Sequence, residues 1–439
     1  MTPDEITENL KTNSQGKILC SISNITYALE NDEILEGAVA INDLTERVDI
    51  IKPLPWHRNG SMLDDMDLNY ITQRLEDLYG FSNDKKIRKA VGIVANNNHY
   101  HPIIDFLEGL KWDGVPRIND CLYHFFGCER TELINKMFLI TLMGMFSRVY
   151  HPGCKFDTML ILVGAQGMGK STFFSFLAHC DDYFTDDIDR IEDEKIFCKL
   201  LGHWICEMPE MKATTSAKYV ESIRAFLTRR TDTYRTPYET YPKDRKRQCI
   251  FVGSSNKIDC LPNDKTGNRR FFPILCDPSK NEVRILDDEA ASRAYIDQVL
   301  AEAMVIYKSG NYPICLSKED EAGFVEYQRQ FTKEDTDEGV IISWIQNYCG
   351  DKICTKMISE LALNKSSDSK GQDRSDILLI VDKAIASGLL PGWRKYEGTK
   401  RFDKYGPQRG WEKIKEPKPE PLPTLVYQNG KCIVDRRNE

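Results

Sequence analysis

Apolar side chains recur at helical spacing through much of the first 150 residues of the chain. In residues 68–78, leucine or isoleucine returns every three or four positions, as on the buried face of an amphipathic helix. Residues 103–110 and 132–150 show the same period and are also predicted to be helical. Residues 18–27 and 38–42 are instead short β-prone runs.

The pattern changes between residues 151 and 276, where continuous apolar runs predict buried β-strands. Helical stretches at 171–179 and 219–228 lie between these runs. Buried apolar strands that alternate with helices are typical of a parallel sheet covered on both faces. The sequence therefore predicts an α/β fold in this region. The predicted strands are 158–163, 203–206, 248–252 and 271–275.

Helical periodicity returns in residues 340–348 and 375–387, and a break at Gly388 follows. Helices followed by a basic, aromatic, two-stranded segment are typical of a winged helix, which presents a helix or a wing to duplex DNA. A lid or an oligomerisation module with the same fold is the alternative. The residues that define this segment are Trp393, Arg394, Lys395, Tyr396, Lys400, Arg401 and Phe402.

These shifts in pattern divide the 439 residues into several domains. We expect a mixed, largely helical N-terminal domain in 1–150 and a parallel-sheet domain in 151–335. These are followed by a small winged-helix-like domain in 340–414 and an extended tail in 415–439. The tail is predicted because proline alternates with charge in 413–423.

Composition excludes several classes of protein. The most apolar run, 138–146, is far shorter than the about 20 residues of a membrane span, so it predicts a buried helix and no membrane partner. The 14 cysteines include no CxxC pair, which favours reduced thiols over a disulfide framework or a zinc site. Residues 1–17 are polar, unlike a secretory signal, and predict a cytoplasmic protein. The net charge of −8 excludes a uniformly basic coat but allows a local basic patch.

Residues 164–171, GAQGMGKS, match the phosphate-binding pattern GxxxxGK[ST] in full, between a predicted strand and a predicted helix. Glycines let backbone N–H groups wrap a phosphate, and the helix points its positive end at the anion. Lys170 is expected to bridge the β- and γ-phosphates of ATP, and Ser171 to ligate Mg²⁺. The expected nucleotide contacts are Gly164, Ala165, Gln166, Gly167, Met168, Gly169, Lys170, Ser171 and Thr172.

Two glutamates, Glu207 and Glu210, follow the predicted strand 203–206. Carboxylates at the carboxyl end of a strand face the ligand crevice of an open α/β sheet. We expect Glu207 to act mainly in the water shell of the Mg²⁺ ion and Glu210 to polarise the attacking water. The two roles could also be exchanged.

Asn256 follows the next predicted strand, where an amide can donate to the γ-phosphate and orient the nucleophilic water. Arg269 and Arg270 directly precede the strand 271–275. They either form a structural ion pair or act as an arginine finger in the site of a neighbouring subunit. We favour the finger.

In order and spacing these four elements resemble superfamily 3 helicases of the AAA+ class, and more closely the virulence-associated protein E family and related phage replication ATPases. The resemblance implies a homo-oligomer, a hexameric ring, in a phage or mobile element. Many relatives carry a primase domain in front, for which this chain lacks room and carboxylate motifs, so primase activity is not carried over. Further matching stretches are 53–57 (PLPWH), 101–114 (HPIIDFLEGLKWDG), 152–155 (PGCK), 232–238 (DTYRTPY), 266–273 (TGNRRFFP) and 406–411 (GPQRGW).

Residues 229–247 hold seven basic residues against three acids in an otherwise acidic chain. Tyrosines lie between them and offer rings for base stacking. Superfamily 3 helicases have a pore-lining hairpin in this interval, and the resemblance implies one at 241–246. A solvated charged face is the alternative. The expected DNA contacts are Tyr241, Lys243, Arg245, Lys246 and Arg247.

These features predict a DNA helicase or DNA-remodelling ATPase that uses ATP and Mg²⁺. Its partners would be single-stranded DNA in a pore and duplex DNA at the winged helix. A nucleotide-gated DNA-binding protein that does not unwind shares every motif and is one alternative. A P-loop phosphotransferase is another; it shares residues 164–171 but would need a lid for its second substrate.

Overall fold

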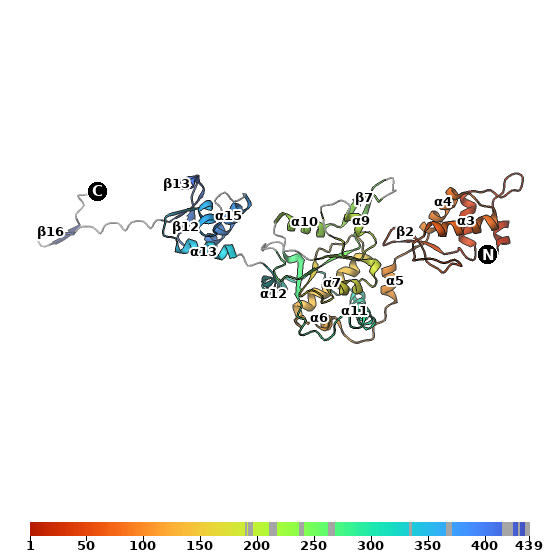
Figure 1. Cartoon of the computed structure of the whole chain (residues 1–439), viewed down its shortest axis with the longest axis horizontal. Helices are drawn as coiled ribbons and strands as arrows, with labels where there is room; N and C mark the ends of the chain where they lie inside the picture. The colour runs from red at the N-terminus through yellow and green to blue at the C-terminus, as the bar shows by residue number, and fades with distance from the viewer. Residues whose placement is uncertain are drawn as a thin grey trace. The chain divides into compact units, whose positions relative to one another are not determined.

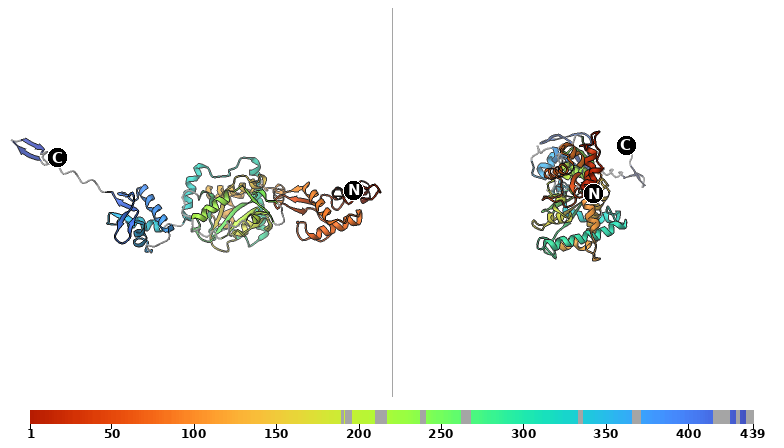
Figure 2. Two further views of the ribbon diagram at one scale, coloured as in Figure 1. Left: turned by 90° about the horizontal axis from the view of Figure 1, so that it is seen from above. Right: turned by 90° about the vertical axis from the view of Figure 1, so that its right-hand side faces the viewer.

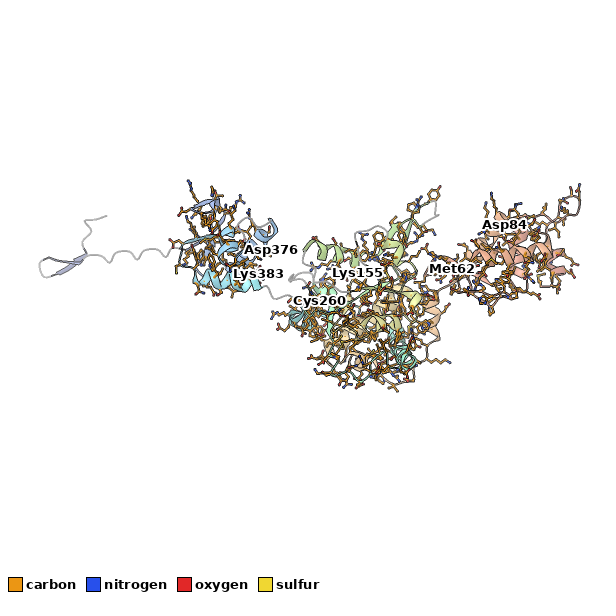
Figure 3. All side chains as sticks on the ribbon, viewed as in Figure 1. Met62, Asp84, Lys155, Cys260, Asp376 and Lys383 are labelled. Carbon is orange, nitrogen blue, oxygen red and sulfur yellow. The ribbon has the colours of Figure 1, made fainter. Side chains whose placement is uncertain are left out.

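The computed structural model divides the chain into two compact units, Met1–Lys333 and Glu334–Glu439 (Figure 1). Figure 3 shows the described side chains on the ribbon of both units. The structure describes all residues except 189–190, 192–195, 210–216, 237–240, 262–267, 333–335, 366–370, 415–424, 429–430 and 435–439.

Residues 1–100 form a module with a hydrophobic core of its own. Its sheet has the order β2–β1–β3, with β1 antiparallel to β2 and parallel to β3. The helix predicted at 68–78 is confirmed as α3, which buries Leu68, Ile71 and Leu75. The elements are α1 (Pro3–Glu8), α2 (Ile22–Asn31), β1 (Val39–Asn42), β2 (Arg47–Ile50), α3 (Asp65–Tyr79), α4 (Asp84–Asn96) and β3 (His99–Tyr100).

The β-prone run 18–27 is largely helical, so the strand predicted there is wrong. Ser21 caps α2, because its hydroxyl accepts a hydrogen bond from the backbone N–H of Asn24. Ile25 and Leu29 then follow at helical spacing and are buried. A cap together with an apolar face outweighs the β propensity of isolated isoleucines.

A five-stranded sheet with all strands parallel forms the centre of the larger unit (Figure 2). Its order is β10–β4–β9–β6–β5, and it confirms the predicted parallel sheet. All five residues of β4 are buried although they point alternately to opposite faces, so both faces are covered. The strands are β4 (Met159–Val163), β5 (Phe184–Thr185), β6 (Ile205–Met208), β9 (Ile250–Ser255) and β10 (Phe271–Leu275).

Helices cover the two faces with separate hydrophobic clusters. Leu160 and Leu162 of β4 pack with residues of α5, α6, α7, α8 and α11, whereas Ile161 and Val163 pack with α9 and α10. The structure therefore groups residues 102–150 with the sheet rather than with an N-terminal domain. The helices are α5 (Pro102–Gly109), α6 (Ile118–Phe126), α7 (Glu132–Tyr150), α8 (Lys170–Leu177), α9 (Ile196–Leu200), α10 (Ala217–Thr228), α11 (Glu289–Ser309) and α12 (Lys318–Gln328).

The smaller unit joins three helices to a three-stranded antiparallel sheet, β11–β15–β12, and to a hairpin, β13–β14. The basic aromatic segment is thus not one two-stranded ribbon, because β12 pairs with β15 while β13 pairs with β14. In the predicted tail, β16 (Leu425–Gln428) pairs with β17 (Lys431–Val434). The remaining elements are α13 (Thr336–Asn347), β11 (Lys352–Cys354), α14 (Thr355–Leu361), α15 (Gly371–Ala386), β12 (Trp393–Lys395), β13 (Lys400–Phe402), β14 (Gly406–Gln408) and β15 (Gly410–Lys413).

The apolar run 138–146 lies inside α7, and most of its side chains are buried in the protein core. Within the described parts of the chain, no helix combines the length and the apolar character needed to cross a bilayer.

Candidate functional site

The glycine-rich loop 164–169 connects β4 to the first turn of α8 at the carboxyl edge of the sheet. Its backbone is held on both sides, because Gly164 N–H donates to the Ser255 carbonyl at 3.0 Å and Cys276 N–H donates to the Val163 carbonyl at 2.7 Å. A Cβ on Gly164 would lie 2.8 Å from the Cβ of Cys276. Gly169 has a φ of +77°, and a Cβ there would lie 2.3 Å from the side chain of Ile285. Gly164 and Gly169 are therefore required by the close packing of this loop.

Lys170 turns back over the loop from the start of α8. Its ammonium group donates to the carbonyl oxygens of Gly164 and Ala165, both at 2.8 Å, and to Oδ1 of Asn256 at 3.0 Å. Asn256 directly follows β9, the neighbour of β4 in the sheet. Burial lowers the pKa of Lys170. The fold thus brings together two predicted site residues that are 86 positions apart in sequence.

Glu207 is fully buried in β6, one strand beyond β9. Its Oε1 accepts a hydrogen bond from the Ser171 hydroxyl at 3.0 Å. Its Oε2 is buried and has no hydrogen-bond partner among the described residues. Burial, together with the nearby charge of Asp186, raises the pKa of Glu207, while the neighbouring hydroxyls of Ser254 and Ser171 lower it. The second predicted glutamate, Glu210, lies outside the described residues.

Asp186 belongs to this edge of the sheet but carried no sequence signal. It follows β5, which has only two residues, so no apolar run marked the strand. The parallel register pairs Phe184 with Ile205 and Thr185 with Cys206. Continued by one residue, the register puts Asp186 beside Glu207.

The paired arginines lie at the opposite edge of the sheet. Arg269 and Arg270 precede β10, which runs parallel to β4, whereas the glycine-rich loop follows β4. Five residues of strand separate the two edges by roughly 16 Å. Arg270 forms an ion pair with Asp157 at 2.9 Å, and Arg269 is exposed. Neither arginine therefore points at the loop of its own chain.

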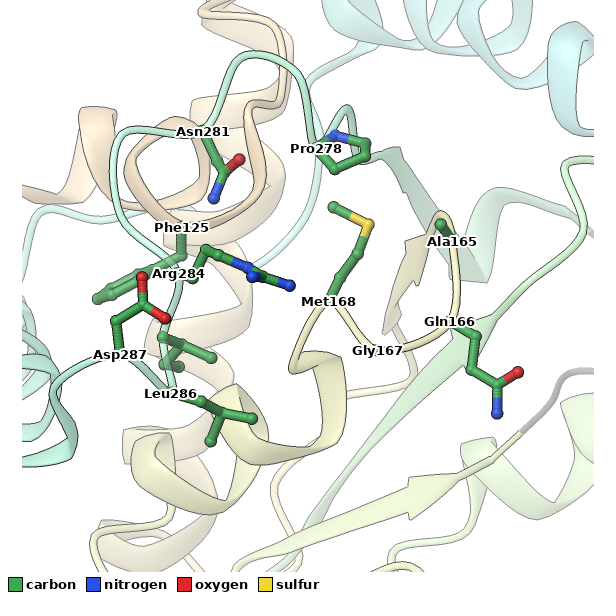
Figure 4. A pocket seen from close by; sticks show the side chains of 11 residues that line it. Phe125, Ala165, Gln166, Gly167, Met168, Pro278, Asn281, Arg284, Leu286 and Asp287 are labelled. Carbon is green, nitrogen blue, oxygen red and sulfur yellow. The ribbon is translucent and has the colours of Figure 1, made fainter.

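A cavity of about 640 Å³ opens beside the glycine-rich loop (Figure 4). One wall is the loop itself, and the other is formed by α6 and the segment that follows β10. Figure 4 shows the side chain of Arg284 extending toward Met168. The sequence analysis missed this wall, which lacks a motif. The residues of the cavity are Phe125, Ala165, Gln166, Gly167, Met168, Pro278, Asn281, Arg284, Ile285, Leu286 and Asp287.

The basic segment forms an antiparallel hairpin of β7 (Thr231–Tyr234) and β8 (Lys243–Lys246). Tyr241, Lys243 and Lys246 are exposed, as DNA contacts would be. Lys243 of this hairpin also approaches Glu46, a residue of the N-terminal module, and its ammonium lies 3.4 Å from the Glu46 carboxylate.

Two of the predicted DNA contacts are buried, which corrects their expected role. Arg247 is 4% exposed, and its guanidinium pairs with both oxygens of Asp232, at 2.5 and 2.9 Å. Arg245 is 7% exposed, bonds the Tyr234 carbonyl at 2.9 Å and pairs with Glu46 at 3.1 Å. Both guanidinium groups hold the hairpin to the protein and are turned away from solvent.

The aromatic residues of the smaller unit are also structural. Trp393, Tyr396 and Phe402 are 6–8% exposed and pack in the core of this unit. Among their basic neighbours, Lys395 pairs with Asp382 and Arg394 with Glu412. These three rings therefore stabilise the smaller unit rather than form an exposed surface.

The fold and the site define a mixed α/β protein in which four polar residues gather at the carboxyl edge of a parallel sheet, namely Lys170, Ser171, Glu207 and Asn256. A family model described as the virulence-associated protein E-like domain matches residues 107–333, just over half of the chain. The chain belongs to this family. The match begins within α5 and includes the whole five-stranded sheet.

Solved structures similar to this chain include two of the C-terminal region of NrS-1, both in the A form without ligand. One is 14% identical with a TM-score of 0.46 and covers 86% of this chain and 96% of its own. The other is 14% identical with a TM-score of 0.45 and covers 90% of this chain and 100% of its own. No curated protein matches this chain.

Proposed function

We propose that this protein is an ATP-hydrolysing DNA helicase or DNA-remodelling ATPase of phage or mobile-element replication, with a P-loop AAA+ core. The observation that carries the proposal is the convergence of Lys170, Ser171, Glu207 and Asn256 on the glycine-rich loop. Ligands of open α/β sheets bind at the carboxyl ends of the strands, where all four residues lie.

The residues fit a nucleotide and a magnesium ion. Oε2 of Glu207 is buried without a partner in the described structure, and a buried carboxylate oxygen is costly unless something binds it. The loop admits no side chain at Gly164 or Gly169, and its N–H groups beyond Gly164, whose own N–H bonds Ser255, would approach the phosphate oxygens. When bound, Mg²⁺ would neutralise charge on the phosphates.

The proposed roles of Lys170, Ser171, Glu207 and Asn256 follow from where they lie, whereas that of Glu210 comes from the sequence alone. Lys170, which now bonds the loop carbonyls and Asn256, would exchange those partners for the β- and γ-phosphates. Ser171 would bind the metal directly, and Glu207 would hold a water of its shell. Asn256 would orient the attacking water, and Glu210 would polarise it.

The cavity beside the loop would take the nucleoside. Its volume of about 640 Å³ lies within the 300–1,000 Å³ of small-molecule sites. Phe125, Met168 and Leu286 offer apolar surface to a base, and Arg284 offers charge to the phosphates or the sugar.

The exposure and position of Arg269 support the proposal that the protein acts as a homo-oligomer. An exposed arginine about a strand's length from its own loop can act on a nucleotide only in a neighbouring subunit, as a homo-hexameric ring would arrange. Arg270, paired with Asp157, would position it. Mixing Arg269→Ala subunits with wild type should then lower the ATPase rate more than in proportion to the mutant fraction.

DNA would be held by Tyr241, Lys243 and Lys246 of the hairpin, which are exposed. The smaller unit would add a winged-helix contact to duplex DNA, since its order of α13, β11, α14 and α15, followed by the paired strands β12 and β15, fits that fold.

The test is to measure ATPase activity with and without single-stranded DNA, strand displacement, and the oligomeric state with ATP and DNA present. We expect DNA-stimulated hydrolysis, unwinding and a hexamer. Stimulation without displacement would favour a nucleotide-gated DNA-binding protein. Phosphate transfer to a small acceptor without any effect of DNA would favour a phosphotransferase.

A further inference from the structure

The end of β5 adds a second carboxylate to the edge that holds Glu207. Phe184 and Thr185 of β5 pair with Ile205 and Cys206 of β6 in parallel register. Residues that are neighbours across two parallel strands point to the same face. Continued by one position, this register gives Asp186 and Glu207 a common face, which is the face that Ser171 meets through its hydrogen bond to Glu207.

Asp187, the next residue, provides an internal contrast. Successive side chains of an extended segment point to opposite sides, so Asp187 faces away from Glu207. Its carboxylate instead pairs with Lys199 of α9 at 2.5 Å. Two adjacent aspartates therefore have different surroundings, and only one of them belongs to the edge of the site.

We propose that Asp186 is a positioning residue of the magnesium site, where its carboxylate holds metal-bound water opposite Glu207. This inference rests on the proposed ATPase function. A second, independent observation supports a ligand at this place, because Oε2 of the fully buried Glu207 has no hydrogen-bond partner among the described residues.

The donor set suits Mg²⁺ shared with a nucleotide. Among the described residues, no three His, Cys, Asp or Glu side chains come close enough to hold a metal by themselves. Magnesium in nucleotide sites keeps several waters and uses one or two carboxylates together with substrate phosphates. Ser171 as direct ligand and two carboxylates accepting hydrogen bonds from the waters meet that requirement.

The test is equilibrium binding of ADP to the full-length chain, with EDTA and across a Mg²⁺ titration. Asp186→Asn keeps the size of the side chain and removes its charge. We expect ADP affinity in EDTA to stay at the wild-type value, while the Mg²⁺ concentration for half-maximal enhancement rises by about 10- to 100-fold, the usual cost of losing an outer-shell partner of a metal. Glu207→Gln should shift the titration in the same direction.

Asp187→Asn is the matched control, because it removes the same charge one residue away. Its ion pair with Lys199 is on the surface, so the variant should fold and titrate as wild type does. A wild-type Mg²⁺ titration for Asp186→Asn would overturn the proposal. Equal losses of affinity with and without Mg²⁺ would also overturn it, since they would indicate a structural role.

The proposed function fails in a different way. If wild-type protein binds no ADP in either condition, the nucleotide site itself is wrong, and the role of Asp186 falls with it. If wild type binds ADP and responds to Mg²⁺ while Asp186→Asn behaves identically, only the role of Asp186 is wrong.

Discussion

The carboxyl edge of the parallel sheet and the β7–β8 hairpin both hold clustered polar side chains, but they use them in different ways. At the edge, Lys170 donates hydrogen bonds to Asn256 and to the glycine-rich loop. Ser171, the next residue, donates a hydrogen bond to Glu207. In the hairpin, Arg245 and Arg247 point into the protein while Lys243 and Lys246 face solvent. A motif that depends on backbone geometry thus identifies side chains individually, whereas a run of charge does not.

The physical reason is the chemistry of arginine. A guanidinium has five donors and stays charged, so it can be buried when carboxylates and carbonyls satisfy it. Asp232 does this for Arg247. The ring centres of Phe226 and Phe251 lie 4.5 and 5.3 Å from the guanidinium carbon of Arg247. A lysine has a compact, strongly hydrated charge that is harder to satisfy in the interior, and both lysines of this hairpin are exposed. Hence, of the four cations predicted to contact DNA, Lys243 and Lys246 face solvent while Arg245 and Arg247 do not.

The largest effect should come from the edge of the sheet. Lys170→Ala removes the charge that lies over the loop and should lower ATP turnover by on the order of 10²–10³-fold or more, the scale for losing a donor to the charge of a transition state. Steady-state hydrolysis measures it. Lys170→Met, which keeps the apolar stem, should be equally inactive if the charge matters. Turnover at the wild-type rate in either variant would remove the site from consideration.

The hairpin arginines should instead matter for stability. Arg247→Ala leaves Asp232 buried without its partner, and breaking a buried ion pair costs about 3–5 kcal/mol of unfolding free energy. Chemical denaturation measures this cost. Lys246→Ala, one residue away and exposed, should change the unfolding free energy by less than about 0.5 kcal/mol. Similar costs for the two variants would contradict the division between buried and exposed cations.

Much of the fold was predictable because long, strongly periodic segments dominate it. The helix expected at 132–150 has those bounds in α7, and all four predicted central strands overlap strands of the parallel sheet. The strand predicted in the run 18–27 was wrong because the Ser21 cap, which periodicity does not reveal, favours a helix at this place.

The site was predictable only where a motif or a strand end marked it. Lys170, Ser171, Glu207 and Asn256 were found in this way, and the structure brings them together. Asp186 and Arg284 were not found. Asp186 follows a strand of two residues, and Arg284 reaches the cavity through a loop, so tertiary structure alone defines their positions.

Removing the two exposed lysines of the hairpin should weaken DNA binding without destabilising the protein. In Lys243→Ala with Lys246→Ala, the log–log slope of DNA affinity against salt should flatten by about one to two units, because fewer counterions are released. All DNA sequences should be affected alike, since phosphate contacts carry no base readout. Fluorescence anisotropy at several salt concentrations measures both effects.

The control for this variant is Lys85→Ala with Lys89→Ala, which removes the same charge from exposed positions of α4. An equal effect of the two double variants would mean that net charge alone is responsible. If the hairpin variant binds DNA as wild type does, the lysines and arginines of the smaller unit become the main candidates for DNA contact.

The smallest expected effect concerns Glu46, which lies where the sheet of the N-terminal module meets the hairpin. Its carboxylate is 3.4 Å from the ammonium of Lys243 and 3.1 Å from the guanidinium of Arg245. A DNA phosphate at Lys243 would therefore compete with a carboxylate already in place. Glu46 also has a φ of +56°, a backbone conformation that L-residues seldom adopt, so the substitution should keep the side-chain shape.

Glu46→Gln removes the competing charge and retains that shape. A partly exposed ion pair is worth up to about 1 kcal/mol, so DNA affinity should rise by at most about fivefold. Glu76→Gln removes the same charge from an exposed position on α3 and should change affinity less. Equal effects of the two variants would mean that Glu46 acts only through net charge. A lower affinity for Glu46→Gln would mean that its carboxylate positions Lys243 for DNA, and DNA binding by the hairpin would then depend on the N-terminal module.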